Sequence, residues 1–394
     1  MNPFRAEAET PFRDAGRAIP WAAGAWEIPE DSQAGSTLAH EAGAFYLQEP
    51  CAMIPARVMN ARPGERILDL CAAPGGKSTQ MGLDMAGEGL LVCNDVVPRR
   101  TEILSGNLER MGIPHSVVTC ARPEKLAAQW PEAFDGVMVD APCSGEGMFR
   151  RHPETRREWS AEKAAGCAAR QKEILREAAR LVRPGGRMVY ATCTWNPAEN
   201  EEQIADFLAE HPDFEPVPFS LGGIDAPEGW TACWLHRTRG EGQFAALLRK
   251  RGDREGMMPT DPGSFRIGRE AVRAAEETLP GLEAPNAAFG QTLIRMREIP
   301  DLRGIQVRRI GLHLGSLRGR VFIPDHAAAR SIHPPKAERW EMTDGEALRY
   351  MAGEAIPGEG WGWMLMTWHG LVLGWGKGSE GQIRNHLPKG LRMY

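Results

Sequence analysis

The chain has 394 residues, with 42 % apolar and 25 % charged side chains, which is typical of a globular protein with room for two or three domains. No apolar run approaches the roughly 18 residues of a membrane span, and the acidic N-terminus disfavours a secretory signal. The net charge is −5, yet residues 301–394 hold 13 Lys and Arg against 9 Asp and Glu. A basic C-terminal region in an otherwise acidic chain is typical of a protein with a polyanionic partner. A solvated surface whose charges are unevenly placed by chance explains the same distribution equally well.

The cysteines are widely spaced, since the closest two stand 20 residues apart and no Cys-x-x-Cys pair occurs. This spacing argues against a zinc site, so no metal is expected, and against a compact disulfide framework. Reduced thiols in a cytoplasmic protein are the resulting expectation. The cysteines are Cys51, Cys71, Cys93, Cys120, Cys143, Cys167, Cys193 and Cys233.

Residues 1–65 are rich in proline, glycine and alanine and show little periodicity. Aromatic residues such as Trp21 and Phe45 indicate that this segment packs on the rest of the protein. A helix is predicted within residues 47–59, and Pro63-Gly64 marks a turn before the first strand.

Residues 66–250 alternate between short β-branched runs and amphipathic stretches, which predicts parallel strands with helices on both faces. The predicted strands are 66–71, 90–94, 116–120, 136–140 and 187–192, and the predicted helices are 77–85, 99–111, 124–130 and 161–182. Asn196 caps a further helix that runs to about residue 210. Residues 230–235 and 243–248 are expected to form a hairpin at the sheet edge.

Residues 251–300 are dominated by charges, proline and glycine and are predicted to form a connector or small subdomain. Short β-like runs return in residues 301–394, so a small, mostly β domain is expected there. His369-Gly370 has the composition of a two-residue hairpin turn. The tail tryptophans at 361, 363, 368 and 375 occupy alternating positions that favour a core, although tryptophan also stacks on bases.

The segment from Leu68 to Ser78 is predicted to be a strand, a glycine loop and a helix start, the arrangement that receives anionic or nucleotide ligands. A phosphate-binding P-loop is excluded because Cys71 occupies the position of its first glycine, and Gly-x-Gly-x-x-Gly is absent. Asp95 ends the next strand, 20 residues after Gly75, where a carboxylate can hold ribose hydroxyls of a nucleoside-type cofactor. A structural turn with a solvent-facing Asp95 is the alternative.

Two further strands end in reactive side chains. One ends in Asp140-Ala-Pro-Cys143 and the other in Thr192-Cys193-Thr194. Because the carboxyl ends of parallel strands meet at one sheet edge, Asp140, Cys143 and Cys193 are expected to lie near the cofactor loop. Each cysteine considered alone is more often an inert buried thiol.

Three motifs together resemble the Sun (Fmu) family of RNA cytosine-5 methyltransferases. They are Asp69-Leu-Cys-Ala-Ala-Pro-Gly-Gly-Lys77, Asp140-Ala-Pro-Cys-Ser-Gly-Glu-Gly-Met-Phe149 and Tyr190-Ala-Thr-Cys-Thr194. Asn196-Pro-Ala-Glu-Asn-Glu201 fits the segment after the second cysteine. In the tail, Gly311-Leu-His-Leu-Gly315, Gly374-Trp-Gly-Lys377 and Asn385-His-Leu-Pro-Lys-Gly390 resemble the RsmF-like bacterial branch.

The resemblance implies a doubly wound, Rossmann-like catalytic domain over residues 66–250 and a PUA-like RNA-binding domain over residues 301–394. It implies Cys193 as the nucleophile, Cys143 as an aid to product release, and Asp140 as a contact to the cofactor or the ring nitrogen. S-adenosylmethionine is then held by Cys71, Ala72, Ala73, Pro74, Gly75, Gly76, Lys77, Asp95 and Asp140. Ribosomal RNA is the favoured substrate of a protein expected to be a monomer.

The sequence departs from the family in two places. The family has a polar or acidic residue after the third strand, near the adenine, whereas residues 119–122 read Thr-Cys-Ala-Arg and the first acid is Glu124. Relatives also begin with a longer RNA-contacting segment than the roughly 40 residues before Glu41, so residues 1–65 represent a shortened N-terminal segment.

Three alternatives are weighed. A tRNA cytosine-5 methyltransferase has the same chemistry. An RNA-binding ribosome assembly factor without catalysis is disfavoured because both cysteines and the cofactor loop are present. An amino-group methyltransferase on this fold would carry an Asn/Asp-Pro-Pro-aromatic motif, which Asp140-Ala-Pro-Cys143 does not match.

Overall fold

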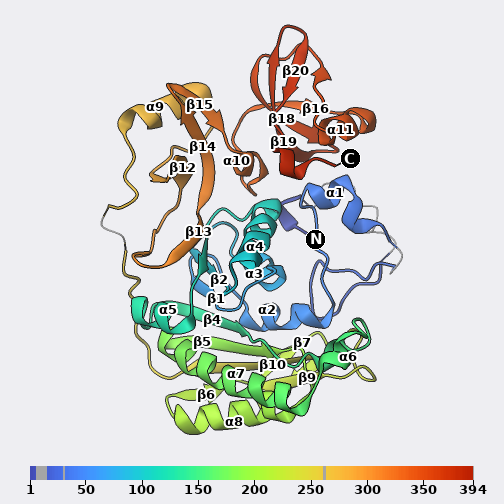
Figure 1. Cartoon of the computed structure of the whole chain (residues 1–394), viewed down its shortest axis with the longest axis vertical. Helices are drawn as coiled ribbons and strands as arrows, with labels where there is room; N and C mark the ends of the chain where they lie inside the picture. Colours follow the sequence, from blue (N-terminus) through green and yellow to red (C-terminus); the bar gives the residue numbers. More distant parts are fainter. Residues whose placement is uncertain (6–15, 30–31, 261–262, 394) are drawn as a thin grey trace.

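The computed structural model describes residues 1–5, 16–29, 32–260 and 263–393. Residues 6–15 and 30–31 of the N-terminal segment and residues 261–262 of the expected connector lie outside the described residues. A sheet with mostly parallel central strands lies in the lower half of Figure 1, and two smaller sheets of the C-terminal part lie above it.

The central sheet has the strand order β13-β3-β2-β1-β4-β5-β10-β6, with β9 paired to β10. Strands β3, β2, β1, β4 and β5 are parallel to one another, and β10 and β13 add antiparallel edges. The strands are β1 (Arg66–Asp69), β2 (Leu90–Asn94), β3 (Ser116–Cys120), β4 (Phe134–Asp140), β5 (Val182–Thr192), β6 (Phe214–Pro216), β9 (Trp230–Cys233), β10 (Gln243–Lys250) and β13 (Gln306–Ile310).

Helices cover both faces of this sheet because its strands are apolar on both sides, as in other parallel sheets. One buried cluster joins α2, α3 and α4 to one face, and another joins α5, α7 and α8 to the opposite face. The helices are α2 (Ile54–Met59), α3 (Gly76–Asp84), α4 (Pro98–Met111), α5 (Pro123–Gln129), α6 (Thr155–Glu158), α7 (Ala161–Leu181) and α8 (Glu201–Glu210). The expected doubly wound architecture is therefore confirmed.

Most of the predicted elements appear within one or two residues of their expected limits. The strands predicted at 90–94 and 116–120 have those limits in the structure. The helix predicted within 47–59 is shorter, because a 3-10 turn, η3 (Cys51–Met53), precedes α2. Asn196 caps a 3-10 turn, η5 (Pro197–Glu199), and α8 begins only at Glu201.

The C-terminal part does not form a single unit from residue 301. Strand β13 joins the central sheet, where it runs antiparallel to β3. A second sheet has the order β11-β12-β14-β15 and a third the order β16-β18-β19-β20-β17. Their strands are β11 (Ala287–Phe289), β12 (Thr292–Arg295), β14 (Leu312–Arg318), β15 (Val321–Pro324), β16 (Glu338–Glu341), β17 (Ile356–Pro357), β18 (Gly362–Trp368), β19 (Leu371–Ser379) and β20 (Gln382–Asn385). The second sheet thus takes strands from the expected connector and from the expected tail domain.

The tail hairpin forms as predicted. His369 and Gly370 both have positive φ between β18 and β19, as a two-residue turn requires. Trp363 and Trp375 are buried in the tail core, as their alternation predicts, whereas Trp361 is 73 % exposed. Helices α9 (Arg269–Thr278), α10 (His326–Arg330) and α11 (Asp344–Met351) complete this part.

The N-terminal segment contacts both halves of the molecule. Trp21 belongs to the core beneath α2 and α3, as expected of a segment that packs on the central domain. Phe45 and the residues of α1 (Leu38–Glu41) instead pack with the third sheet, and α1 lies beside that sheet in Figure 1. Arg309 of β13 pairs with Glu109 of α4 at 2.6 Å, which adds a charged contact between the C-terminal part and the central domain.

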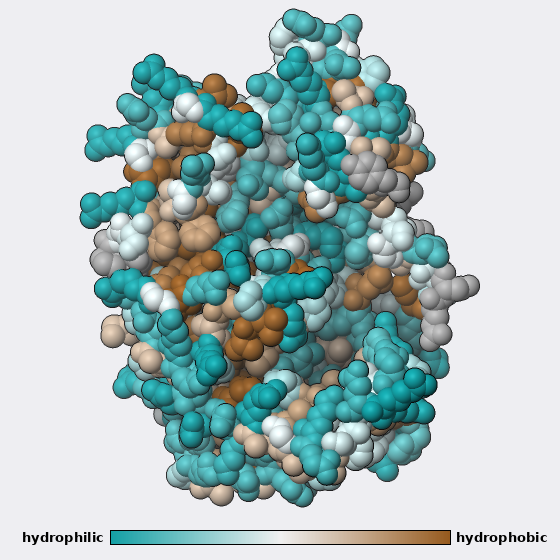
Figure 2. Space-filling model, in the orientation of Figure 1, coloured by the Kyte–Doolittle hydropathy of each residue, from teal (hydrophilic) through white to brown (hydrophobic). Residues whose placement is uncertain are grey.

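The surface is mostly hydrophilic, with apolar side chains gathered toward the left of the view in Figure 2. Within the ranges that the structure describes, none of the helices has the length and apolarity required to cross a bilayer.

Candidate active site

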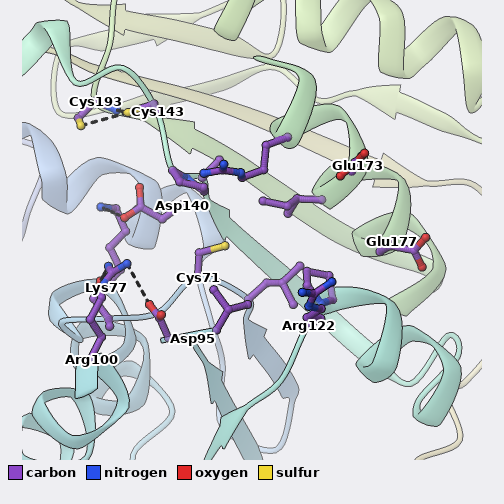
Figure 3. Close-up of a pocket in the computed structure, with 18 of the residues that line it drawn as sticks. Cys71, Lys77, Asp95, Arg100, Arg122, Asp140, Cys143, Glu173, Glu177 and Cys193 are labelled. Atoms are coloured by element: carbon purple, nitrogen blue, oxygen red, sulfur yellow. Dashed lines mark hydrogen bonds and ion pairs between the residues drawn. The ribbon is translucent and has the colours of Figure 1, made fainter. Parts of the chain in front are cut away.

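The carboxyl ends of β1, β2, β4 and β5 meet around a cavity of about 670 Å³. Cys71, Asp95, Asp140, Cys143 and Cys193 all line it, which places the strand-end residues together at one edge as the sequence predicts. Figure 3 shows Cys143 and Cys193 at one end of this cavity, Cys71 near its middle, and Arg122 with Glu177 toward the other end.

The loop between β1 and α3 forms part of the cavity wall. Leu70 and Ala72 donate backbone hydrogen bonds to Met138 and Asn94 of the flanking strands, at 2.9 and 2.8 Å. Gly75 has φ of +113°, and a Cβ there would come within 3.0 Å of the Leu104 side chain. The positive φ favours glycine at this position, and a larger residue would also press on the Leu104 side chain.

The predicted cofactor residues divide into two groups. Cys71, Ala73 and Lys77 line the cavity. Ala72, Pro74, Gly75 and Gly76 are not among its lining residues and instead shape the turn into α3. The backbone oxygens of Ala73 and Pro74 are held from α4, by Arg100 at 2.6 Å and Asn107 at 2.9 Å.

Asp95 is fixed at the end of β2 with only 3 % of its surface exposed. One carboxylate oxygen accepts a hydrogen bond from the Val97 amide at 2.9 Å, and Arg100 lies 3.4 Å from the other oxygen. A solvent-facing Asp95 is therefore wrong, and its carboxylate borders the cavity as a ribose contact requires.

Lys77 and Asp140 form an ion pair at 2.8 Å between the cofactor loop and the end of β4. Burial lowers the pKa of Lys77, but the attraction of the Asp140 charge and the hydrogen bond that Lys77 donates to Asp140 outweigh it, so the pKa of Lys77 stands above its usual value. Below this pair, burial raises the pKa of Asp69 to about 7, although Ser78 donates a hydrogen bond to its carboxylate at 2.6 Å. The cavity wall thus carries a firmly charged ammonium beside the Asp140 carboxylate, whereas Asp69 is fully buried and does not line the cavity.

The sulfur atoms of Cys143 and Cys193 lie 3.3 Å apart. The pKa of Cys193 is lowered, first by a hydrogen bond from the Cys143 thiol and further by the charge of Lys77, against the opposing effect of burial. The pKa of Cys143 is raised well above the ordinary thiol value by the same hydrogen bond and by burial. Of the two thiols, Cys193 is therefore the one that loses its proton more readily.

Buried polar residues hold both cysteine loops in place. Glu199 accepts hydrogen bonds from the Ser144 amide at 3.0 Å and from Gln171 at 2.8 Å. The Asn200 side chain accepts a hydrogen bond from the Thr192 hydroxyl at 2.5 Å and donates one to the Thr194 backbone oxygen at 3.0 Å. It therefore holds the residues on both sides of Cys193. The segment after the second cysteine therefore positions the two thiols.

Sequence reasoning missed one wall of the cavity, which α7 supplies. Its lining residues on this helix are Arg170, Glu173, Ile174, Arg176 and Glu177. They are mostly spaced by three or four positions and so share one face of the helix. A helix face that mixes charged residues with one apolar residue is the sequence feature that could have indicated this wall. Arg122 and Glu124 follow β3 and also line the cavity, at the end where the usual acidic residue is missing.

The cavity fits S-adenosylmethionine in size and chemistry. Ligand cavities commonly measure roughly 300–1,000 Å³, and this one has walls from four strand ends and α7. Asp95 and Asp140 both present carboxylates to the cavity, and such groups can accept hydrogen bonds from ribose hydroxyls and balance a positive charge. Within the described residues, no group of His, Cys, Asp and Glu is arranged to hold a metal ion. The fold and the cavity together define a Rossmann-like methyltransferase that uses S-adenosylmethionine.

Comparison with known proteins specifies the family. The family model described as 16S rRNA methyltransferase RsmB/F matches residues 56–249, and the model described as methyltransferase RsmF PUA domain matches residues 337–393. The chain is 32 % identical to ribosomal RNA small subunit methyltransferase F of Salmonella heidelberg, over 95 % of this chain and 84 % of that protein. The Pectobacterium atrosepticum protein of the same name is 30 % identical, over 95 % and 83 %.

Solved structures show the same catalytic fold. NSun6 from Pyrococcus horikoshii with SFG is 26 % identical with a TM-score of 0.51, covering 56 % of each chain. A methyltransferase homologue from Pyrococcus horikoshii is 26 % identical with a TM-score of 0.52, covering 60 % of this chain and 78 % of that one. The chain belongs to the RsmB/F family of S-adenosylmethionine-dependent methyltransferases, and its C-terminal residues form the PUA domain of the RsmF type.

Proposed function

We propose that this protein transfers a methyl group from S-adenosylmethionine to carbon 5 of a cytosine in small-subunit ribosomal RNA. The observation that carries the proposal is the pair of thiols, 3.3 Å apart, in the same cavity as the cofactor loop. Methyltransferases that modify an amino group need no thiol, whereas carbon 5 of a pyrimidine requires activation by a nucleophile.

The reaction begins with Cys193. Its thiolate forms a bond to carbon 6 of the cytosine, and the electron pair of the 5,6 double bond moves so that carbon 5 becomes nucleophilic. Carbon 5 then forms a bond to the methyl group, and the bond from that methyl group to sulfur breaks. S-adenosylmethionine supplies this electrophilic methyl group. Lys77 and Asp140, paired at 2.8 Å, lie at the same end of the cavity, where Asp140 contacts the cofactor or the ring nitrogen.

Release of the product requires loss of the proton on carbon 5. Cys143 holds its proton at rest because burial and its contact with Cys193 raise its pKa. Once Cys193 is bonded to carbon 6, that contact is gone, so Cys143 can lose its proton to solvent through the cavity. It then takes the carbon 5 proton, and the electron pair left behind restores the double bond and expels Cys193 as a thiolate. The net products are the methylated base, S-adenosylhomocysteine and one proton.

We assign cofactor binding to the residues predicted from the sequence. Cys71, Ala73 and Lys77 border the bound molecule, while Ala72, Pro74, Gly75 and Gly76 hold the loop that presents them. Asp95 binds the ribose hydroxyls, and Asp140 faces the sulfonium end. The lining of the cavity and the burial of Asp95 support this assignment.

Small-subunit ribosomal RNA is the proposed substrate because 95 % of the chain matches relatives of that name, over 83 % and 84 % of their length. The target base must leave its stack to reach Cys193 inside the cavity, so a loop or an exposed nucleotide is expected. We propose that residues 337–393 bind the same RNA. A cytoplasmic monomer remains the expected form of the protein.

A test replaces the nucleophile and a matched cysteine in parallel. Cys193→Ala should abolish methyl transfer to small-subunit RNA while S-adenosylmethionine binding persists. Cys167→Ala is the control, because this half-buried cysteine on α7 does not line the cavity. Bisulfite sequencing of RNA from a strain lacking the gene then names the cytosine. Retained activity in Cys193→Ala would overturn the assignment of Cys193 as the nucleophile. If tRNA were modified and ribosomal RNA were not, the proposed substrate would be wrong.

A further inference from the structure

Two tryptophans stack on each other beside the nucleophile. The rings of Trp195 and Trp234 lie 5.6 Å apart between centroids and only 6° from parallel. Trp195 is held by a hydrogen bond from its indole N–H to the Cys233 oxygen at 2.8 Å. Trp234 lies in the loop after β9 with 37 % of its surface exposed, so the pair reaches from a fixed inner ring to an exposed outer ring.

Close backbone contacts connect this pair to the thiols. The Gly147 amide donates to the Cys193 oxygen at 3.0 Å, and the Gly242 amide donates to the Gly147 oxygen at 3.0 Å. A Cβ on Gly242 would come within 2.7 Å of the Trp195 ring. Trp195 therefore packs directly on the backbone that holds the cysteine loops, two residues from Cys193.

The loops around the pair are basic. Arg150 is bonded to Glu241 at 3.0 Å, which ties the loop before α6 to the loop before β10. Figure 1 shows α6 and β9 on the same side of the central sheet. Four exposed arginines of these loops and of α6 form no ion pair with a carboxylate among the residues that the structure describes: Arg151, Arg156, Arg157 and Arg237. This surface therefore complements a phosphate backbone.

We infer that Trp195 and Trp234 form a stacking platform for the nucleotide next to the target cytosine, with these four exposed arginines on its phosphates. The inference rests on the proposed function, because it requires an RNA whose target base enters the cavity. When that base leaves its stack, the neighbouring base loses one stacking partner. The exposed face of Trp234 replaces that partner, and Trp195 supports it from below.

The test compares three substitutions at one exposed position. Trp234→Ala should raise the KM for small-subunit RNA about 5- to 150-fold, the range that corresponds to stacking of one base on an aromatic ring. The kcat and the affinity for S-adenosylmethionine should change little. Trp234→Phe keeps an aromatic face and should restore most of the affinity, whereas Trp234→Leu keeps apolar bulk and should not. Leu235→Ala is the control on the same loop, because its side chain is 39 % exposed and cannot stack.

Direct binding separates this inference from the proposed function. The probe is a fluorescein-labelled single-stranded fragment of small-subunit RNA, titrated with the full chain. If the wild-type protein methylates no cytosine, the proposed function fails, and the binding series still decides the platform. Equal affinities for wild type and Trp234→Ala would overturn the platform. An equal loss in Leu235→Ala, or full affinity in Trp234→Leu, would overturn it as well.

Discussion

The reactivity of Cys193 should depend on the thiol of Cys143. The two sulfur atoms are 3.3 Å apart, and the Cys193 amide also points to the Cys143 sulfur at 3.4 Å. A hydrogen bond to a charged acceptor contributes about 1.5–3 kcal/mol. Cys143→Ala removes this donor. Burial and the charge of Asp140, which both disfavour the thiolate, are then opposed only by the charge of Lys77 and a backbone hydrogen bond. The thiolate population below its pKa should then fall about 10- to 150-fold.

Alkylation with iodoacetamide, followed by mass spectrometry at Cys193, measures this population across pH. In the wild-type protein, the rate should reach its plateau below the pH at which an ordinary thiol does so, because the pKa of Cys193 is lowered. The rate is lost as the pH falls through that pKa. In Cys143→Ala the whole profile should move to higher pH, and Cys143→Ser, which keeps a hydroxyl donor, should lie between. Superimposable profiles for wild type and Cys143→Ala would refute the reasoning.

Three further predictions concern the cofactor and the stability of the fold. Asp95→Asn should weaken S-adenosylmethionine binding by calorimetry, because an amide replaces the carboxylate at the ribose position, and unchanged affinity would contradict the assignment. Arg309→Met should lower the free energy of unfolding by about 3 kcal/mol in urea, since it leaves the Glu109 carboxylate without its partner, and adding Glu109→Gln should recover part of the loss. Asp69, with its pKa raised to about 7, binds a proton in the native state that the unfolded chain has released above about pH 4. The free energy of unfolding should therefore fall from pH 4 to pH 7, and Asp69→Asn should flatten that dependence in urea titrations at several pH values.

The core of the site could be predicted from local sequence because of one geometric rule. Asp95 follows β2, Asp140 and Cys143 stand at the end of β4, and Cys193 follows β5. The carboxyl ends of these three parallel strands share an edge. The hydrophobic pattern of the sequence identified those strands, so the proximity of these residues could be predicted without knowledge of the tertiary structure. The hairpin at His369-Gly370 was predictable for a similar reason, since its turn geometry depends on two adjacent residues.

The features that escaped prediction depend on contacts between distant residues. Strand β13 adds to the edge of β3 across nearly 200 positions of sequence, a pairing that no local pattern specifies. To predict that α7 forms a wall of the cavity, one must know which face of this helix meets the edge of the sheet. The stacking of Trp195 on Trp234 depends on the close approach of Gly147 and Gly242, which appears only in the folded chain.

Identification of the atom that bonds to the RNA is the most direct test of the account. Cys143→Ala should accumulate a covalent protein–RNA complex with small-subunit RNA and S-adenosylmethionine, because the adduct forms but the carbon 5 proton is not removed. Nuclease and protease digestion followed by mass spectrometry should place a methylated cytosine on the peptide that contains Cys193, and Cys193→Ala in the same background should remove it. An adduct on another cysteine, or no adduct with an RNA that the wild-type protein methylates, would contradict the proposed mechanism.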